Sequence, residues 1–315
     1  MKHTYLKLPS NMKLINQSFK FINQTDFSLV GIKKHIERCA RVSYKSEDKI
    51  TDTSYEKFVS MLKSREHDRP LEFGTVHLKM IFPDFQEFTD NLLTLGIFND
   101  IWIKSTYVGD IVYITTNYRY YLDITKCLPN VKEYFTEEDN EYYPKRYTVH
   151  MILDRGVMDE FRTHVGLSHL AESTRYCNYS KDKFNNEVTF IEPCWLDMHD
   201  TDEGREVTRN WNFDILDGCS IIAEESEFDD ARDAFLTSLN VAEHCYLELL
   251  QKGWTPQKAR SVLPLGIKSE LISCGFEDAW KNFLYRRDAD DAHPMAREIA
   301  KPMHKEFIER GFIDK

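Results

Sequence analysis

The sequence predicts an α+β fold organised as a single domain. Apolar residues recur at helical spacing in some segments and alternate in others, but the two kinds of segment do not follow the strand–helix order of a doubly wound sheet. The 315 residues are 42% hydrophobic, which is enough for a core without disulfide staples. We therefore expect one domain over residues 1–315, with acidic, irregular surface insertions near 83–110, 128–146 and 197–228.

Two helices and then two strands are expected in the first half of the chain. Apolar residues recur on one face in 27–45 and again in 54–64, which predicts amphipathic helices. Apolar residues occupy every second position of 75–82, which predicts a half-buried strand. Residues 112–121 are rich in Tyr, Thr and Ile, so we expect a strand there, or a strand that enters a helix.

A third strand is expected at the middle of the chain, followed by a helix. Residues 147–153 have the composition of a strand, and the Asp-Arg-Gly sequence at 154–156 indicates a turn that closes it. The next helix should then begin near residue 157 and run towards residue 167.

Glycine and proline mark the helix boundaries expected in the C-terminal part. The apolar stripe of 231–252 predicts the longest helix, which Gly253 should end. Thr255 and Pro256 are typical of an N-cap and a first helical position, so a second helix should begin there. The last helix is expected to begin at about Pro294.

Charge and hydropathy exclude two classes of partner. Lys and Arg together number 41 and Asp and Glu 52, so the net charge is −11. A nucleic-acid binder normally carries a basic face, so we expect no nucleic-acid partner. No run approaches the roughly 18 apolar residues of a membrane span, so we expect no membrane partner.

The cysteines favour a reducing compartment. The seven cysteines are odd in number and widely spaced, without the close pairs of zinc or thioredoxin motifs. We therefore expect reduced cysteines and no metal site. The first ten residues contain no apolar stretch typical of a secretory signal, so we expect a cytoplasmic location.

Three basic segments interrupt the acidic background. They are residues 162–164 with 173–180, residues 258–260, and residues 285–287 with His293. Each combines Arg with hydroxyl, amide or imidazole groups, and the planar guanidinium suits pairs of phosphate or carbonyl oxygens. The segments therefore predict a site for a phosphate-bearing ligand with a planar carbonyl ring; the alternative is that each arginine forms a solvated salt bridge. Glycine-rich phosphate loops are absent from the sequence, so side chains and helix ends would hold the ligand.

The first basic segment resembles the signature of the flavin-dependent thymidylate synthases. That signature is Arg-His-Arg, two residues, Ser, and then Ser-x-Arg-Tyr. The signature residues kept in this chain are His164, Ser168, Ser173, Arg175 and Tyr176. Thr163 and Val165 replace the two signature arginines, and Arg162, one position earlier, is a candidate to contact the same anion.

Four other blocks are similar to the same family and follow in the family's order. They are Ala40-Arg41-Val42-Ser43-Tyr44, His67-Asp68-Arg69-Pro70-Leu71-Glu72-Phe73, Ala259-Arg260-Ser261-Val262-Leu263-Pro264, and Trp280 to Arg287 followed by Ala292-His293-Pro294. In the second block Phe73 replaces the final His of the family pattern. The blocks cover less than half of the residues but extend over most of the chain.

The resemblance implies a fold and a set of site residues. The fold would be the family's α+β fold, a mixed sheet with a helical layer, in one catalytic domain. FAD would be bound by Ser43, His67, Arg69, Thr163, His164, Val165, Asn282 and His293. Deoxyuridylate would be bound by Glu160, Arg162, Ala171, Glu172, Ser173, Thr174, Arg175, Arg260 and Arg287. Arg287, facing the uracil carbonyls, and Ser173, a positioning donor, would be the catalytic residues.

The resemblance also implies a reaction and an assembly. The reaction would be the reductive methylation of dUMP to dTMP, with methylenetetrahydrofolate as carbon donor and NADPH reducing FAD. The protein would be a homotetramer. Three alternatives stay open: a related flavin and folate enzyme that methylates or hydroxymethylates another pyrimidine nucleotide, a non-catalytic nucleotide-binding relative, and a flavoprotein oxidase without folate chemistry.

Overall fold

The computed structural model describes residues 13–175, 177–181, 184, 187–196, 213–216, 220–223 and 231–314. The chain divides into two compact units whose segments interleave along the sequence. Unit 1 contains Met1–Gln17, Asp154–Gly156 and Ser173–Lys268, and unit 2 contains Ser18–Leu153, Val157–Glu172 and Ser269–Lys315. The predicted α+β class is confirmed, since helices are present together with sheets that contain antiparallel strand pairs. The single domain over 1–315 stays a prediction.

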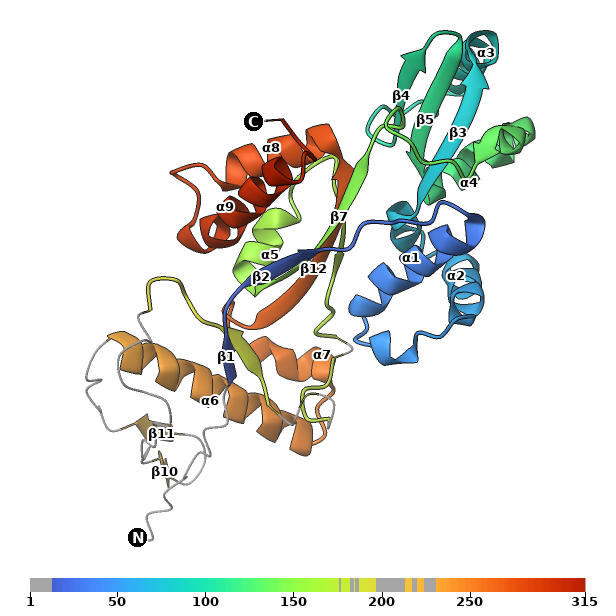
Figure 1. Ribbon diagram of the computed structural model, residues 1–315. Coiled ribbons are helices and arrows are strands. Elements are labelled where there is room, and N and C mark those ends of the chain that lie inside the picture. Colours follow the sequence, from blue (N-terminus) through green and yellow to red (C-terminus); the bar gives the residue numbers. More distant parts are fainter. Residues whose placement is uncertain are drawn as a thin grey trace. The chain divides into compact units, whose positions relative to one another are not determined.

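One sheet of unit 2 is built from strands that are far apart in the sequence (Figure 1). Its strands, in spatial order, are β2 (Ser18–Phe21), β7 (Arg146–Asp154), β12 (Lys268–Phe276) and β8 (Ser168–Ala171). β2 and β7 pair antiparallel, and so do β12 and β8, where Ser273 is directly opposite His169. Of these four strands, the sequence predicted only β7.

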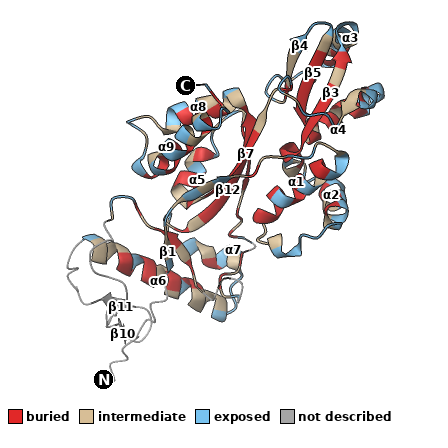
Figure 2. Cartoon of the chain, viewed as in Figure 1, coloured by how far each residue is buried: buried red, intermediate tan, exposed pale blue. Residues whose placement is uncertain are grey.

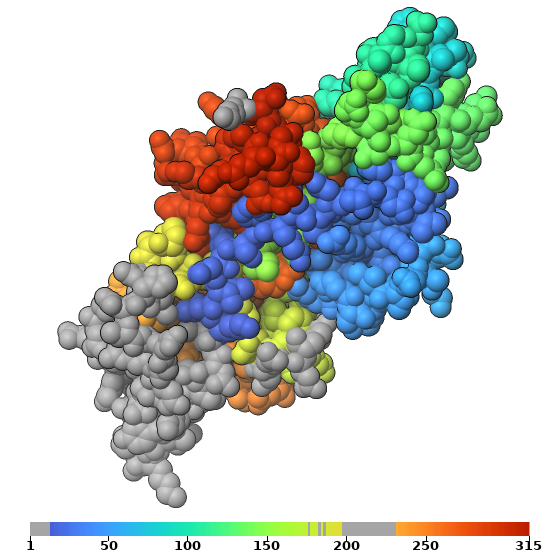
Figure 3. Space-filling model, in the orientation of Figure 1, coloured from blue at the N-terminus to red at the C-terminus, as the bar shows by residue number. Residues whose placement is uncertain are grey.

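Two C-terminal helices pack on this sheet through aromatic side chains. They are α8 (Glu277–Arg287) and α9 (Pro294–Glu309). The indole N–H of Trp280 donates to the Tyr147 carbonyl over 3.0 Å, and the Phe307 ring lies 5.1 Å from the Trp280 ring. The buried residues of both helices are red in Figure 2, and in the space-filling view of Figure 3 this C-terminal segment forms one closely packed surface. The last predicted helix is therefore confirmed, with its start at Pro294.

The second sheet of unit 2 carries a separate hydrophobic core. Its order is β4 (Ile103–Val108), β5 (Ile111–Asn117), β3 (Thr75–Ile81) and β6 (Phe135–Thr136). The core also draws residues from α1 (Leu29–Val42), α2 (Ser54–Ser64), α3 (Phe82–Thr94) and α4 (Tyr118–Cys127). The helices expected in 27–45 and 54–64 are confirmed, as is the strand entering a helix at 112–121.

Three local expectations in unit 2 are wrong. The region 83–110 is not irregular, because Phe88 and Leu92 bury one face of α3 and β4 follows it. The region 128–146 likewise contains a 3₁₀ helix, Pro129–Tyr134, and then β6. Strand β3 is not half-buried, because His77 on its expected polar face is only 1% exposed and stacks between the rings of Phe27 and Tyr143.

The turn expected at 154–156 is also wrong. Helix α5 (Arg155–Phe161) begins directly after β7, and the Arg155 amide donates to the Leu265 carbonyl over 2.9 Å. The helix ends at Phe161 instead of continuing towards residue 167. The expected insertion at 197–228 lies outside the described residues, apart from the backbones of β10 (Phe213–Leu216) and β11 (Ser220–Ala223).

Unit 1 contains the longest helix of the described chain. Strand β1 (Lys13–Ile15) pairs in parallel with β9 (Thr189–Ile191), and α6 (Ala231–Gln251) is followed by the short α7 (Pro256–Ala259). Gly253, with φ of +88°, follows α6 in the left-handed conformation that glycine tolerates. Both predicted helix starts and the glycine stop are confirmed, although the Thr255 side chain forms no cap hydrogen bond.

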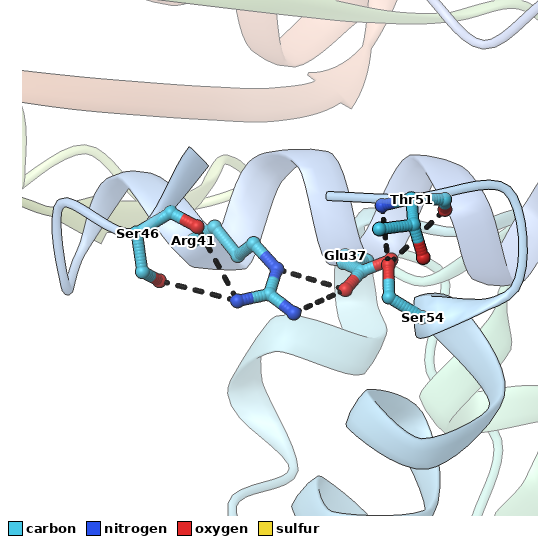
Figure 4. Close-up of polar contacts among 5 residues, drawn as sticks. All are labelled: Glu37, Arg41, Ser46, Thr51 and Ser54. Atoms are coloured by element: carbon cyan, nitrogen blue, oxygen red, sulfur yellow. Dashed lines mark hydrogen bonds and ion pairs between the residues drawn. The ribbon is translucent and has the colours of Figure 1, made fainter. Parts of the chain in front are cut away.

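A buried ion pair closes the loop that follows α1 (Figure 4). Arg41 donates from Nε and Nη2 to one oxygen of Glu37 over 2.8 and 2.6 Å, and from Nη1 to the Ser46 carbonyl over 3.3 Å. The other Glu37 oxygen accepts from the Ser54 hydroxyl at the start of α2, over 2.8 Å. Glu37 is 1% exposed and Arg41 8%, so the buried Glu37 joins α1 to α2 while Arg41, of the first family-like block, holds the loop at Ser46.

Candidate active site

The guanidinium of Arg287, in the last turn of α8, is held by two residues from another part of unit 2. Its Nε donates to Nε2 of His164 over 2.7 Å. Its Nη1 donates to the Glu160 carboxylate over 2.7 Å, and its Nη2 to the Glu160 carbonyl over 2.9 Å. These contacts occupy three of the five N–H donors of an arginine. The fork is therefore fixed in orientation, with one further N–H on each terminal nitrogen.

A surface ion pair between Arg287 and its neighbouring aspartates is not found. The Arg287 side chain is 19% exposed and pairs with Glu160. Asp288 instead contacts Nδ1 of His304 over 2.9 Å, and Asp290 pairs with Arg297 over 3.0 Å. Asp288 and Asp290 thus have other partners, and Arg287 instead bonds Glu160 of α5 and His164, which follows α5.

His164 is held in its neutral form. Burial, followed by the positive charges of Arg287 and Arg286, lowers its pKa to about 4. Its Nε2 accepts the Arg287 hydrogen bond and so carries no proton. Its ring also packs edge-to-face on Phe283, with the ring centroids 4.9 Å apart. An acceptor nitrogen is thereby presented to Arg287 across the neutral pH range.

A pocket of about 1090 Å³ opens beside Arg287 within unit 2. Five of the residues predicted to bind ligands line it: Thr163, His164, Val165, Asn282 and Arg287. The pocket is also lined by residues that were not predicted as site residues: Tyr285, Arg286, Asp288, Ala289, Asp291 and His304. Tyr285 and Arg286 belong to the third basic segment of the sequence. His304 lies on α9, and no sequence motif marks it as a site residue.

The pocket's donors are of the kinds that a phosphate-bearing nucleotide ligand uses, although the carboxylates Asp288 and Asp291 also line it. Arg286, Arg287 and Asn282 supply cationic and amide N–H groups, and Thr163 supplies a hydroxyl. The Val165 side chain is 74% exposed at the pocket, where it offers an apolar contact in place of a signature arginine.

A buried carboxylate joins the second family-like block to the signature segment. Glu72, 4% exposed, accepts from the Ser168 hydroxyl over 2.7 Å and from Arg119 over 2.5 Å. Its own carbonyl accepts from Arg146 over 2.7 Å. Residues almost a hundred positions apart are thus brought into one hydrogen-bonded group.

The other residues predicted to bind FAD lie outside this pocket. Ser43 caps α1 and is half-buried, while His67 and Arg69 are exposed around the start of the 3₁₀ helix Arg69–Phe73. His293 is exposed at the N-cap of α9. Arg69 lies close enough for its charge to lower the pKa of His169, so it belongs to the same neighbourhood of unit 2.

The predicted phosphate ligands of unit 1 form a second group. Arg260 donates to the hydroxyl of the buried Thr174 over 3.0 Å. Arg175 donates from Nε to the Gln257 amide oxygen over 3.2 Å. The first and second basic segments are therefore in contact, and Arg260 bonds Thr174 rather than capping α7 by its side chain. Ser173, half-buried, begins this segment, and its carbonyl accepts from the Cys177 amide over 3.1 Å.

The remaining residues predicted to bind the substrate lie outside both groups of contacts described above. Arg162 is exposed and reaches Asp159 over 3.4 Å. Ala171 ends β8 half-buried, and the amide of the buried Glu172 donates to the Glu270 carbonyl over 2.7 Å. Tyr176 of the signature lies outside the described residues.

The described ranges contain neither a membrane-spanning helix nor a cluster of metal-ligating side chains. Among the helices of those ranges, none is long and apolar enough to cross a membrane. The same residues contain no group of three or more His, Cys, Asp or Glu side chains that could hold a metal ion.

Comparisons with known proteins agree with the motif resemblance. No curated protein matches the sequence. The solved structure of a UMP/dUMP methylase PolB from Streptomyces cacaoi, bound with 5-Br dUMP, is similar over 94% of this chain and 92% of that chain. Its identity of 15% and TM-score of 0.40 are too low to bear on the activity of this chain. The family model for thymidylate synthase complementing protein, Thy1, matches residues 145–310, which is more than half of the 315 residues. The chain therefore belongs to the Thy1 family, that of the flavin-dependent thymidylate synthases, and is a methyltransferase of the thymidylate synthase type.

Proposed function

We propose that this protein carries out the reductive methylation of dUMP to dTMP, with methylenetetrahydrofolate as carbon donor. The observation that carries the proposal is Arg287, fixed by Glu160 and neutral His164 at the edge of a large pocket. Family membership supports the reaction class. The substrates are small molecules, dUMP and the folate.

Arg287 is the proposed catalytic residue. The ring carbon of uracil becomes nucleophilic as negative charge develops on the ring and its carbonyl oxygens. The two N–H groups of Arg287 beyond its contacts with Glu160 and His164 would donate to that charge. A fixed donor of this kind typically contributes about 3–4 kcal/mol to the transition state. Cysteine attack is not required, and Cys177 is fully buried.

We propose that Arg175 and Arg260, with Thr174, bind the phosphate of dUMP. Thr174 accepts from Arg260, which leaves the Thr174 hydroxyl hydrogen for a ligand oxygen. Arg175 is exposed and donates from Nε to Gln257, and a guanidinium is the group that forms charge-assisted, paired hydrogen bonds with phosphate. Ser173 is proposed as a positioning donor beside them. Glu160, Arg162, Ala171 and Glu172 are the other proposed substrate contacts.

FAD is the proposed cofactor, and when bound it would supply the hydride that NADPH provides. Thr163, His164, Val165 and Asn282 would hold it along the pocket wall, with Ser43, His67, Arg69 and His293 as further proposed contacts. Of these, Thr163 and Asn282 would donate or accept hydrogen bonds, and Val165 would contact an apolar face. We also propose that the protein is cytoplasmic and forms a homotetramer. Light scattering of the purified protein would test the tetramer.

The decisive assay measures dTMP formed from dUMP. The purified protein is incubated with FAD, NADPH and methylenetetrahydrofolate, and the product is identified by mass spectrometry. We expect dTMP formation that depends on all three additions. A colourless protein that cannot be reconstituted with FAD and forms no product would instead favour a non-catalytic nucleotide-binding protein. NADPH consumption without dTMP would favour an oxidase.

A second candidate activity is methylation or hydroxymethylation of another pyrimidine nucleotide. Thr163 and Val165, in place of the two signature arginines, motivate this candidate because they change the charge of the pocket. Tritium release from ring-labelled dUMP and from other labelled pyrimidine nucleotides, with product identification, separates the two activities. Release from dUMP alone supports dTMP synthesis.

A further inference from the structure

His169 is a buried polar residue to which the proposed function assigns no role. It lies on β8 and is 6% exposed. Its Nδ1 is 2.8 Å from the Ser273 hydroxyl, directly across the strand pair with β12. Its Nε2 is 3.4 Å from the backbone carbonyl of His164. Both ring nitrogens of this side chain are therefore occupied.

The chemistry of its partners fixes the direction of each hydrogen bond. A carbonyl can only accept, so Nε2 of His169 carries the ring proton and donates to His164. Nδ1 is then an acceptor and receives the Ser273 hydroxyl hydrogen. Burial is the main cause that lowers the pKa of His169 to about 4, so the ring keeps this neutral form near pH 7.

His164 is consequently held at two points. Its carbonyl accepts from His169, and its ring nitrogen accepts from Arg287. The next residues, Gly166 and Leu167, pack closely against Gly275 of β12. A Cβ at Gly275 would lie only 2.9 Å from the Gly166 carbonyl oxygen and 2.5 Å from the Leu167 side chain, so a larger residue would not fit there. The segment between α5 and β8 is thus anchored to the sheet on one side and to Arg287 on the other.

We propose that His169, supported by Ser273, is a positioning residue that orients Arg287 through His164. The polar chain runs from Ser273 on β12 to His169, from His169 to the His164 backbone, and from the His164 ring to Nε of Arg287. It supports the segment in which Thr163 and Val165 replace the signature arginines. The expected effect on kcat rests on the proposed function, whereas the effect of His169 on the orientation of Arg287 does not depend on it.

The test compares two variants at His169 with a matched control in full-length protein. His169→Phe keeps a buried ring and removes both hydrogen bonds, and His169→Gln keeps an amide donor that can reach the His164 carbonyl. His77→Phe is the control, because His77 is another fully buried histidine, in the sheet of β3. Exchange of the Arg287 Nε–H with water is measured by NMR on arginine-labelled protein, and kcat and KM are measured in the methylation assay.

In His169→Phe we expect the exchange of the Arg287 Nε–H to rise about tenfold, as for loss of one hydrogen bond. We also expect kcat to fall about 100-fold, the effect of misplacing a catalytic group by about 1 Å, with KM for the nucleotide nearly unchanged. His169→Gln should recover most of both quantities, and His77→Phe should change neither. Wild-type exchange and kcat in a folded His169→Phe would overturn the proposal.

Ser273→Ala provides the second route if His169→Phe does not fold. It leaves the imidazole in place and removes only the hydroxyl, so we expect the same changes in smaller amount. Unchanged exchange in this variant, with His169→Phe unfolded, would mean that His169 is structural only and would overturn the proposal. If the wild-type protein methylates no pyrimidine nucleotide, the proposed function fails, and the exchange measurement alone supports or overturns the positioning role.

Discussion

Arg287 and His164, which are 123 positions apart in the sequence, share a 2.7 Å hydrogen bond in which the guanidinium Nε donates to the imidazole Nε2. The direction of this bond requires a neutral histidine, and the lowered pKa of His164 meets that requirement. The bond joins the end of α8 to the segment after α5. It also aims the remaining N–H groups of Arg287 in a direction set by the fold.

Arg287→Ala should retain the fold and nearly abolish turnover. The variant removes the donor that would stabilise charge on the uracil ring, and loss of one such donor typically lowers kcat about 100- to 1000-fold. Turnover is measured as dTMP formation, with circular dichroism and flavin absorbance as controls for folding and cofactor binding. Full activity in Arg287→Ala would remove its proposed role.

Arg260→Ala and Arg175→Ala should weaken nucleotide binding with a smaller effect on turnover. Each loses a charge-assisted hydrogen bond to the phosphate, typically worth about 1.5–3 kcal/mol. Calorimetric titration with dUMP gives the dissociation constants. Lys258→Ala is the matched control, because it removes an exposed cation next to Arg260 and should leave affinity unchanged. Unchanged affinity in Arg175→Ala would count against a phosphate contact there.

Glu37→Ala should destabilise unit 2 strongly. It leaves the buried Arg41 guanidinium without its carboxylate and removes the acceptor for Ser54. Removing one partner of a buried pair typically costs about 3–5 kcal/mol. Urea unfolding followed by tryptophan fluorescence measures the change. Glu47→Ala, at a nearby but more exposed carboxylate, should change the free energy of unfolding very little.

Stability should fall as the pH is lowered from about 6.5 to about 4. Burial is the first cause that lowers the pKa of His77, His164 and His169 to about 4 and of His35 to about 3. These side chains take up protons in the unfolded chain at a pH where the folded protein still excludes them, so acid favours unfolding. Thermal denaturation across this pH range measures the loss.

His77→Phe separates the histidine contribution from that of the carboxylates, which also titrate in acid. The variant keeps a ring between Phe27 and Tyr143 but cannot take up a proton. Its melting temperature should therefore fall less steeply between pH 6.5 and 4 than that of the wild-type protein. An identical slope in the two proteins would contradict the assignment.

The sequence predicted the elements whose periodicity is strong and local. The helices α1, α2, α6 and α9 and the strands β3, β5 and β7 all carry a clear apolar pattern or a proline or glycine boundary. The missed strand β12 is buried on both faces, so its residues do not alternate and no strand period is visible. Strand β8 has only four residues, and its pairing with β12 depends on chain contacts that no local pattern records.

Motifs in the sequence indicated several residues of the candidate site, but not the residues that hold them in place or complete the pocket. Family-like motifs named Thr163, His164, Val165 and Asn282 as flavin contacts and Arg287 as a substrate contact, and the structure places these five residues around one pocket. They did not indicate that Glu160 would hold Arg287, or that His304 from α9 would line the pocket, because both depend on tertiary packing. His77 was similarly hidden, since a histidine stacked between aromatic rings has no signature along the chain.

The strand order β2-β7-β12-β8 has a consequence for how the protein emerges from the ribosome. β12 is the last of these strands to be synthesised, yet it lies between β7 and β8. Until β12 has left the exit tunnel, β8 lacks its neighbour and Ser273 cannot form its hydrogen bond with His169. This four-stranded sheet is therefore completed late, through contacts of long sequence separation, which are slow to form.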